Sequence, residues 1–188
     1  EARFIERLNR FAALVDLNST KTLVHVPSSG RMRELLVAGY RMLLQDVGNT
    51  DRKTAYDLAL VDLGTILCST DSRLPPCLVQ EAFYEGRLGQ FVGYQSLRKE
   101  VALAGSRIDL MLSGSGGICY VETKSVTLVV DGVALFPDAP TVRGAKHMHS
   151  LAQAVEAGHR AAVVFVVQRD DSQAFESHDS ADPDFGIA

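Results

Sequence analysis

The sequence contains two acids and one amine whose spacing could bring them together for a metal-assisted reaction. They are Asp109, Glu122 and Lys124. Side chains alternate between the two faces of a strand, so Glu122 and Lys124 point the same way in a predicted strand over Ile118–Ser125. A hairpin with the preceding predicted strand, Arg107–Leu112, can pair Asp109 with Glu122 at about 5 Å between Cβ atoms. Two carboxylates this close repel each other unless a positive charge lies between them. The spacing therefore predicts a cation site.

Oxygen ligands of this kind suit a hard divalent cation, Mg²⁺ or Mn²⁺. Lys124 could orient a water molecule or offset the charge that develops on a phosphate. A metal ion that lowers the pKa of water, together with a lysine, suits phosphodiester hydrolysis. The alternative is an amphipathic hairpin whose solvent face carries a cross-strand salt bridge of about 0.2–1 kcal/mol.

The second half of the chain alternates helix and strand around these residues. Thr141 is the predicted N-cap of the second helix, and Gly89 is the predicted residue after the first. The last strand is almost continuously apolar, which favours a buried central position. A loose polar loop is expected over Asp170–Asp184. The predicted order is a helix Cys77–Leu88, strands Gln95–Leu103, Arg107–Leu112 and Ile118–Ser125, a helix Arg143–Ala157 and a strand Arg160–Val167.

The first half reads as short strands, which is typical of a small β-barrel. A single helical turn is expected over Met32–Leu36, and Pro75-Pro76 marks a boundary because neither proline can continue a strand ladder. The predicted strands are Arg10–Leu17, Lys21–Val26, Thr54–Asp62 and Thr65–Ser69.

Composition limits the class of protein. The chain has 188 residues with 46% hydrophobic content, which suits a globular protein of one or two domains. Its longest apolar run, Ala161–Val167, is too short for a membrane span. Cys68, Cys77 and Cys119 form no CxxC pair, so neither a zinc site nor a disulfide framework is implied. A cytoplasmic protein is expected, with no membrane partner.

Basic residues gather locally although the formal net charge is −4. Such pairs are ordinary on a solvated surface, but near a site they could contact phosphates. Arg143, Lys146 and His147 open the second predicted helix, where backbone N–H groups favour a phosphate. The candidate nucleic-acid contacts are Arg31, Arg52, Lys53, Arg107, Arg143, Lys146 and His147.

Several stretches resemble the sugar fermentation stimulation protein A family of bacteria and archaea, and the resemblance covers essentially the whole chain. It implies an α/β (α+β) protein with an OB-like β-barrel in residues 1–72. A domain similar to the PD-(D/E)XK restriction-endonuclease-like nucleases, with αβββαβ order, would follow in residues 73–188. The matching stretches are Val26–Met32, Arg52–Tyr56, Ser106–Leu112, Tyr120–Leu128 and Phe136–His147.

The resemblance also implies roles for particular residues. Asp109, Glu122 and Lys124 correspond to the catalytic Asp and E-x-K elements of such nucleases, and Glu81 is similar to their helix carboxylate. Asp109, Glu122 and Glu81 would then hold Mg²⁺ or Mn²⁺. The family is described as DNA-binding and linked to sugar utilisation, so DNA is the expected partner; RNA and a homodimer are left open.

Three functions follow as hypotheses. The first is a DNA-binding, divalent-metal-dependent nuclease. The second is a non-catalytic DNA-binding regulator of sugar metabolism that retains a nuclease fold. The third is a metal-bound module for a sugar or nucleotide metabolite.

Overall fold

The computed structural model of the protein describes residues 1–48 and 52–188. The chain forms two compact units that alternate along the sequence. The first unit contains Glu1–Arg73, Ser125–Ala139 and Val167–Ser177, and the second contains Leu74–Lys124, Pro140–Val166 and His178–Ala188. The sequence-based division at residues 72 and 73 is continuous, whereas each of these units is assembled from separate stretches.

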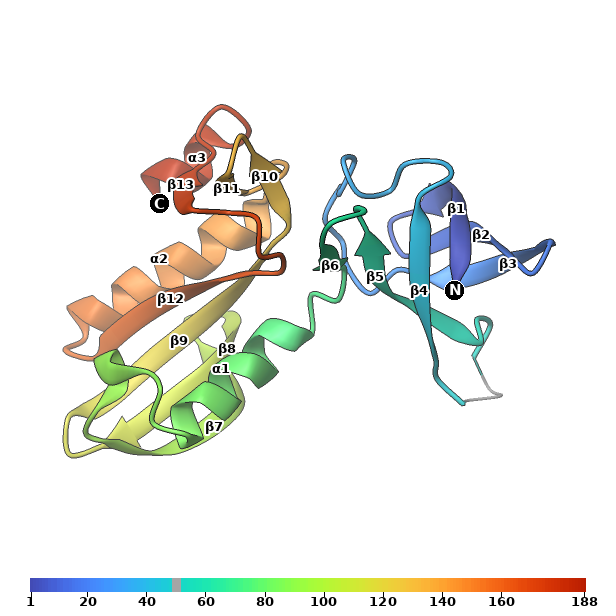
Figure 1. The fold of residues 1–188 in the computed structure, drawn as a ribbon. Coiled ribbons are helices and arrows are strands. Elements are labelled where there is room, and N and C mark those ends of the chain that lie inside the picture. Colours follow the sequence, from blue (N-terminus) through green and yellow to red (C-terminus); the bar gives the residue numbers. More distant parts are fainter. Residues whose placement is uncertain (49–51) are drawn as a thin grey trace. The chain divides into compact units, whose positions relative to one another are not determined.

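The first unit contains a closed barrel (Figure 1). Its strand order is β3-β2-β1-β4-β5-β6, and a parallel pairing of β3 with β5 closes the first five strands. The predicted barrel is therefore confirmed. The strands are β1 (Ala2–Asn9), β2 (Ala12–Leu17), β3 (Thr20–His25), β4 (Arg41–Asp46), β5 (Tyr56–Asp62) and β6 (Leu67–Ser69).

Two barrel strands, β1 and β4, were not predicted. Strand β1 carries one extra residue between Phe4 and Glu6 and another between Arg7 and Asn9, whereas the register shift beside Leu43 and Leu44 of β4 leaves its extra residue on β5. A bulge inserts one residue and reverses the alternation of inward and outward side chains. The period-2 pattern that reveals a strand in the sequence is therefore interrupted in β1. In β4 the three successive apolar residues Met42–Leu44 hide it.

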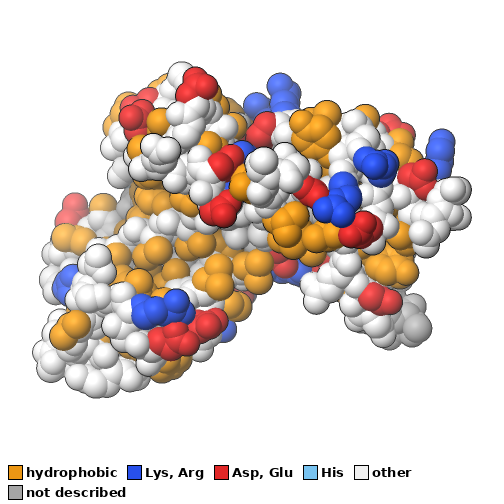
Figure 2. Space-filling model, viewed as in Figure 1, with side chains coloured by type: hydrophobic (Ala, Val, Ile, Leu, Met, Phe, Trp, Pro, Cys, Tyr) orange, Lys and Arg blue, Asp and Glu red, His pale blue; other side chains and the backbone are white. Residues whose placement is uncertain are grey.

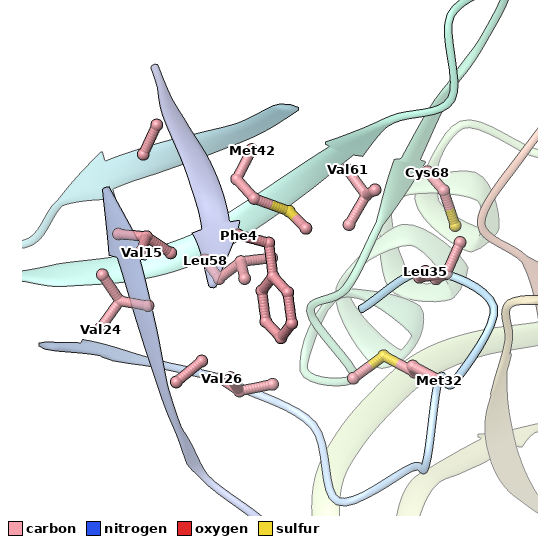
Figure 3. Close-up of a cluster of buried hydrophobic side chains, with 12 residues drawn as sticks. Phe4, Val15, Val24, Val26, Met32, Leu35, Met42, Leu58, Val61 and Cys68 are labelled. Atoms are coloured by element: carbon pink, nitrogen blue, oxygen red, sulfur yellow. The ribbon is translucent and has the colours of Figure 1, made fainter. Parts of the chain in front are cut away.

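The barrel core is apolar and closely packed. Phe4, Val15, Val24, Met42 and Leu58 extend into it from five different strands (Figure 3). Each is almost completely removed from water, and burial of such a side chain stabilises the fold by about 1.5–3 kcal/mol. Alternation along β2 and β3 thus directs one side of each strand inward and leaves the other outside.

A three-stranded sheet completes the first unit. Its order is β10-β11-β13, with β11 and β13 parallel. The predicted loose loop over Asp170–Asp184 is therefore wrong, because β13 and the short helix α3 both begin within it. The elements are β10 (Leu128–Val130), β11 (Val133–Phe136) and β13 (Ala174–Ser177), while α3 (Pro183–Ile187) belongs to the second unit.

The second unit has the predicted αβββαβ order around a four-stranded sheet of order β12-β9-β8-β7 (Figure 1). Thr141 caps α2 as expected, since its hydroxyl accepts a hydrogen bond from the Gly144 amide at 3.0 Å. The elements are α1 (Leu74–Tyr84), a 3-10 turn η1 (Gly89–Phe91), β7 (Tyr94–Leu103), β8 (Ser106–Gly114), β9 (Gly117–Val126), α2 (Val142–Glu156) and β12 (Arg160–Val167).

Two predicted details of this unit are wrong. Helix α1 starts at Leu74 and ends at Tyr84, because both prolines fit its first turn and Gly86 takes the left-handed conformation (φ +68°) after its end. Strand β12 lies at the edge of the sheet and is only partly buried. Figure 2 shows apolar side chains gathered over this part of the second unit. A β-branched, apolar run suits an edge as well as a centre when helices cover part of the sheet.

No helix within residues 1–48 and 52–188 is long and apolar enough to cross a membrane. The three cysteines are free thiols, and Cys68 and Cys119 are buried.

Candidate active site

The β8–β9 hairpin brings the three predicted residues together. Its antiparallel register runs from the turn up to the pair Leu110–Val121, and just beyond that pair the Asp109 amide lies 3.4 Å from Glu122 Oε2. Leu110 and Val121 belong to the apolar cluster on one face of the sheet. Because side chains alternate, Asp109, Glu122 and Lys124 share the other face.

Glu122 lies at the centre of the group and is only 2% exposed. Its Oε1 atom accepts a hydrogen bond from Lys124 Nζ at 2.5 Å and is also contacted by Nδ1 of His147. Among the described residues, the Asp109 amide is the donor to its Oε2 atom, through a long contact of 3.4 Å. One carboxylate oxygen of Glu122 is thus tightly held by basic groups, and the other is weakly engaged.

Asp109 is partly buried beside it. Its Oδ2 atom accepts hydrogen bonds from the Thr123 amide at 2.8 Å and from the Thr123 hydroxyl at 2.6 Å. Burial, reinforced by the nearby charge of Glu122, raises the pKa of the Asp109 carboxyl, although the Thr123 hydrogen bonds and Lys124 act in the opposite direction. The folded state thus disfavours the charged form of Asp109, mainly because the carboxyl is buried.

Helix α2 contributes His147 to this face. Gly144, His147, Leu151 and Ala154 are buried and recur at the three- and four-residue spacing of one helix face. The Arg143 Nε–H points to His147 Nε2 at 3.4 Å, which requires that nitrogen to be an acceptor. Nδ1 of His147 then carries the proton and donates it toward Glu122.

The buried position of His147 differs from the exposed phosphate contact that the sequence suggests. The signal was present in the spacing, because His147 falls between Gly144 and Leu151 on the apolar face of α2. A buried histidine needs a polar partner, and Glu122 supplies it. The sequence pattern does not show which face of the sheet α2 covers.

Glu81 is not brought into this group. Helix α1 packs Val79 and Phe83 against the cluster that contains Leu110, on the opposite face of the sheet from Glu122. The Glu81 side chain is 61% exposed, and its ion-pair partner among the described residues is Arg87 at 3.9 Å. The role assigned to Glu81 therefore stays a prediction, and no described contact joins it to Asp109.

The predicted basic residues of the second unit are exposed. Arg143 lies in the first turn of α2, and Lys146 one turn later donates from Nζ to the Gly105 carbonyl at 2.9 Å. Arg107 forms a solvent-exposed pair with Glu100 at 3.4 Å. Arg143 and Lys146 stand on the same helix as His147, so positive charge is available beside the acidic group.

The predicted basic residues of the first unit differ in their surroundings. Arg52 donates from Nη2 to Oδ1 of the buried Asp57 at 2.7 Å. Lys53 and Arg31 are exposed. Their contact with nucleic acid stays a prediction.

The donor set fits a hard divalent cation. Two carboxylates and one ammonium leave one formal negative charge, since the hydrogen bonds of His147 are those of a neutral ring. Asp109 Oδ1 has no hydrogen-bond partner in the described ranges, and Glu122 Oε2 has only its long one. Within those ranges no three acidic, histidine or cysteine side chains form a complete metal-binding group. The two carboxylates alone are a set that Mg²⁺ can take, because it usually binds one or two carboxylates and completes its shell with water and substrate phosphate.

Comparisons with known proteins cover both halves of the chain. Residues 5–70 match the model of the SfsA N-terminal OB domain, and residues 73–188 match that of the sugar fermentation stimulation protein RE domain. A sugar fermentation stimulation protein homolog of Caldanaerobacter subterraneus subsp. tengcongensis is 47% identical over 186 residues, which are 99% of this chain and 81% of the relative. One from Desulforamulus reducens is 45% identical over 98% of this chain and 77% of its own length.

A solved structure is similar over nearly the whole chain. It is described as Pyrococcus furiosus SfsA in complex with Ca²⁺. The match has a TM-score of 0.91 at 26% identity and covers 99% of this chain and 80% of the other. The expected architecture, an OB barrel followed by an α/β domain, is thereby confirmed.

Proposed function

The chain belongs to the sugar fermentation stimulation protein family, and we propose that its Asp109, Glu122 and Lys124 form a divalent-metal-dependent site for phosphodiester hydrolysis in nucleic acid. The observation that carries the proposal is the buried Glu122 carboxylate, set opposite a second acid and held by a lysine. The description of the Pyrococcus furiosus relative as a complex with Ca²⁺, a hard divalent cation, supports the proposal.

Asp109 Oδ1 and Glu122 Oε2 are the atoms that would hold the ion. When bound, Mg²⁺ or Mn²⁺ would supply a water of lowered pKa and a Lewis acid for the phosphate. Thr123 keeps the Asp109 carboxylate in place through Oδ2, so that its other oxygen stays oriented. His147 does the same for Glu122 through Oε1.

Lys124 is the residue that would act on the substrate. Its ammonium now donates to Glu122 Oε1 from a largely buried position, and the same group can orient a water or offset negative charge on a phosphate. Arg143 and Lys146 provide exposed positive charge on α2 for the flanking phosphates. DNA is the proposed substrate. RNA, which is also linked by phosphodiester bonds, is tested beside it.

The test is cleavage of labelled single- and double-stranded DNA and RNA with Mg²⁺ or Mn²⁺. Asp109→Ala and Lys124→Ala should each lose cleavage by a factor on the order of 100 or more, while EDTA should abolish it. Glu100→Gln is the matched control, because Glu100 is an exposed carboxylate on β7 of the same sheet. Equal activity in the wild type, Asp109→Ala and Lys124→Ala would falsify the assignment.

The non-catalytic regulator has one observation in its favour. Lys124 and His147 both engage the same Glu122 oxygen, so this part of the group is internally satisfied without substrate. A protein of this kind would bind DNA equally well with and without EDTA and would cleave none of the substrates. In either case increasing salt should weaken binding, because phosphate contacts release counterions.

A further inference from the structure

Asp182 is a buried carboxylate of the second unit that lies outside the acidic group of the candidate active site. It is 6% exposed, and each of its oxygens accepts a backbone hydrogen bond. Its Oδ1 atom accepts from the Phe185 amide at 3.1 Å and thereby caps the short helix α3. Its Oδ2 atom accepts from the Thr141 amide at 2.6 Å, 41 residues away in the chain. One side chain therefore ties α3 to the N-cap residue of α2.

The first turn of α2 is closely packed against the same segment. Helix α3 lies beside the start of α2 (Figure 1), and Phe185 is 7% exposed. A Cβ atom added at Gly144 would lie only 2.7 Å from Thr141 Cγ2 and 3.2 Å from Phe185 Cδ2. Glycine thus permits an approach that any larger residue would prevent. The position of this turn is fixed by its contacts with Asp182 and Phe185.

His147 follows this turn on the same buried face of α2. Gly144 and His147 are three residues apart, so they are neighbours on the helix surface. The imidazole contacts Glu122 through Oε1, which leaves Oε2 as the weakly engaged oxygen of that carboxylate. If the first turn moves, the imidazole moves with it and the carboxylate loses this support. Residues that hold a metal ligand in this way influence metal affinity without touching the ion.

The middle of α2 is held separately by the sheet. Lys146 Nζ donates to the Gly105 carbonyl at 2.9 Å, and the Ser150 and Ser106 hydroxyls are 2.8 Å apart. Ser150 is 3% exposed. Because these contacts do not involve Asp182, α2 should stay folded on β8 when the contact of Asp182 with its first turn is lost.

We propose that Asp182 is a positioning residue of the candidate active site: by holding Thr141 it places the first turn of α2, and with it His147, for contact with the metal-site carboxylate. The inference rests on the proposed function, because it gives the orientation of that carboxylate a purpose. It extends that function to a residue that touches neither the ion nor the substrate.

Asp182→Ser separates this role from the capping of α3. Serine is as good an N-cap as aspartate, so it can still accept from the Phe185 amide. Its single side-chain oxygen cannot also serve Thr141, which bonds the other oxygen of the carboxylate. A residue that only caps α3 therefore predicts wild-type behaviour in Asp182→Ser, whereas a positioning residue predicts a change at His147.

The first measurement is the NMR signal of the His147 Nδ1 proton, recorded on the full chain in EDTA and identified by its absence in His147→Gln. In the wild type the contact with Glu122 should protect this proton from exchange with water. The signal should broaden or disappear in Asp182→Ser. It should do the same in Gly144→Ala, because the added Cβ atom displaces the same turn.

Gly158→Ala is the matched control at the other end of α2. Gly158 follows the C-cap in the left-handed conformation (φ +85°), and a Cβ atom there would have no neighbour within 4 Å. The variant should lower the melting temperature through backbone strain and leave the His147 signal unchanged.

The second measurement is Mn²⁺ binding by calorimetry. Asp182→Ser and Gly144→Ala should each bind Mn²⁺ about ten-fold or more weakly than the wild type, as is usual when the support of a metal ligand is removed. Gly158→Ala should keep the wild-type affinity.

Three results would overturn the inference. They are an unchanged His147 signal in Asp182→Ser, loss of the signal in Gly158→Ala, and a wild type without a protected His147 proton. If Asp182→Ser does not fold, Gly144→Ala decides by the same criterion. If the wild type binds no Mn²⁺, the proposed function fails, while the His147 signal, recorded without metal, still decides whether Asp182 positions the helix.

Discussion

Each unit of the molecule contains one deeply buried carboxylate surrounded by basic side chains. Asp57 in the barrel and Glu122 in the sheet of the second unit are both 2% exposed. Asp57 is paired with His25, Arg52 and Arg73, so that both of its oxygens face cationic partners. Glu122 has a lysine and a histidine on one oxygen and a second acid opposite it.

The pKa shifts of the acids separate the two groups. Burial alone would raise the pKa of Asp57, but hydrogen bonds from Arg73, Arg52 and His25 outweigh it and lower the pKa. Burial raises the pKa of Asp109, and the charge of Glu122 adds to the effect. A buried acid surrounded by cations is a closed structural cluster, whereas two acids that share one lysine leave negative charge for a ligand.

The largest contrast is expected in activity. Glu122→Gln should reduce metal-dependent cleavage by a factor on the order of 100 or more, because it removes charge from the proposed metal site. Asp57→Asn should cleave at the wild-type rate when assayed well below its melting temperature. The comparison breaks if both variants lose activity to the same extent while folded, as judged by circular dichroism.

In stability the ranking of the two variants should be the opposite, with Asp57→Asn losing more free energy of unfolding than Glu122→Gln. Asp57→Asn leaves two arginines without their charged acceptor and should destabilise the first unit by about 2–3 kcal/mol. The loss is smaller than the about 3–5 kcal/mol for a fully buried pair, because both arginines keep contact with water. Urea denaturation measures it, with Glu100→Gln as the exposed-pair control. An unchanged midpoint would show that the Asp57 cluster contributes nothing to folding.

The contribution of Asp57 should depend on pH in a known direction. Its folded-state pKa is lowered, so the stabilisation is fully present above the unfolded-state pKa of about 3.9 and is lost as pH falls through the folded-state value. The melting temperatures of the wild type and Asp57→Asn should therefore converge in acid. A gap that stays constant down to the lowest pH would argue against an ionised Asp57.

The smallest expected effect is a gain in the stability of the second unit. In EDTA, Asp109→Asn should stabilise the second unit by about 1 kcal/mol or less, because the folded state disfavours the charged Asp109 carboxylate. Added Mn²⁺ should then raise the melting temperature of the wild type but not of the variant, since a ligand stabilises only the state that binds it. Destabilisation of Asp109→Asn in EDTA would mean that the acid serves the fold and not a ligand.

Much of the candidate site followed from local pattern. The two-residue period of a strand placed Glu122 and Lys124 on one face, and the Gly-rich join Ser113–Gly117 put Asp109 directly or diagonally opposite Val121–Glu122. Thr141 was identifiable as an N-cap from its position before α2. Strand β1 escaped prediction because its two bulges interrupt the alternation, and β4 escaped because three apolar residues follow one another in it.

By itself, the sequence determined which side chains share a strand or helix face, because these depend on repeats of two or 3.6 residues within one element. The tertiary structure alone decided which helix covers which face of the sheet. In the folded chain His147 contacts Glu122, Glu81 lies on the helix that packs on the other face of the sheet, and β12 is an edge strand. Such choices depend on contacts between residues distant in the chain, and many arrangements satisfy the same local pattern.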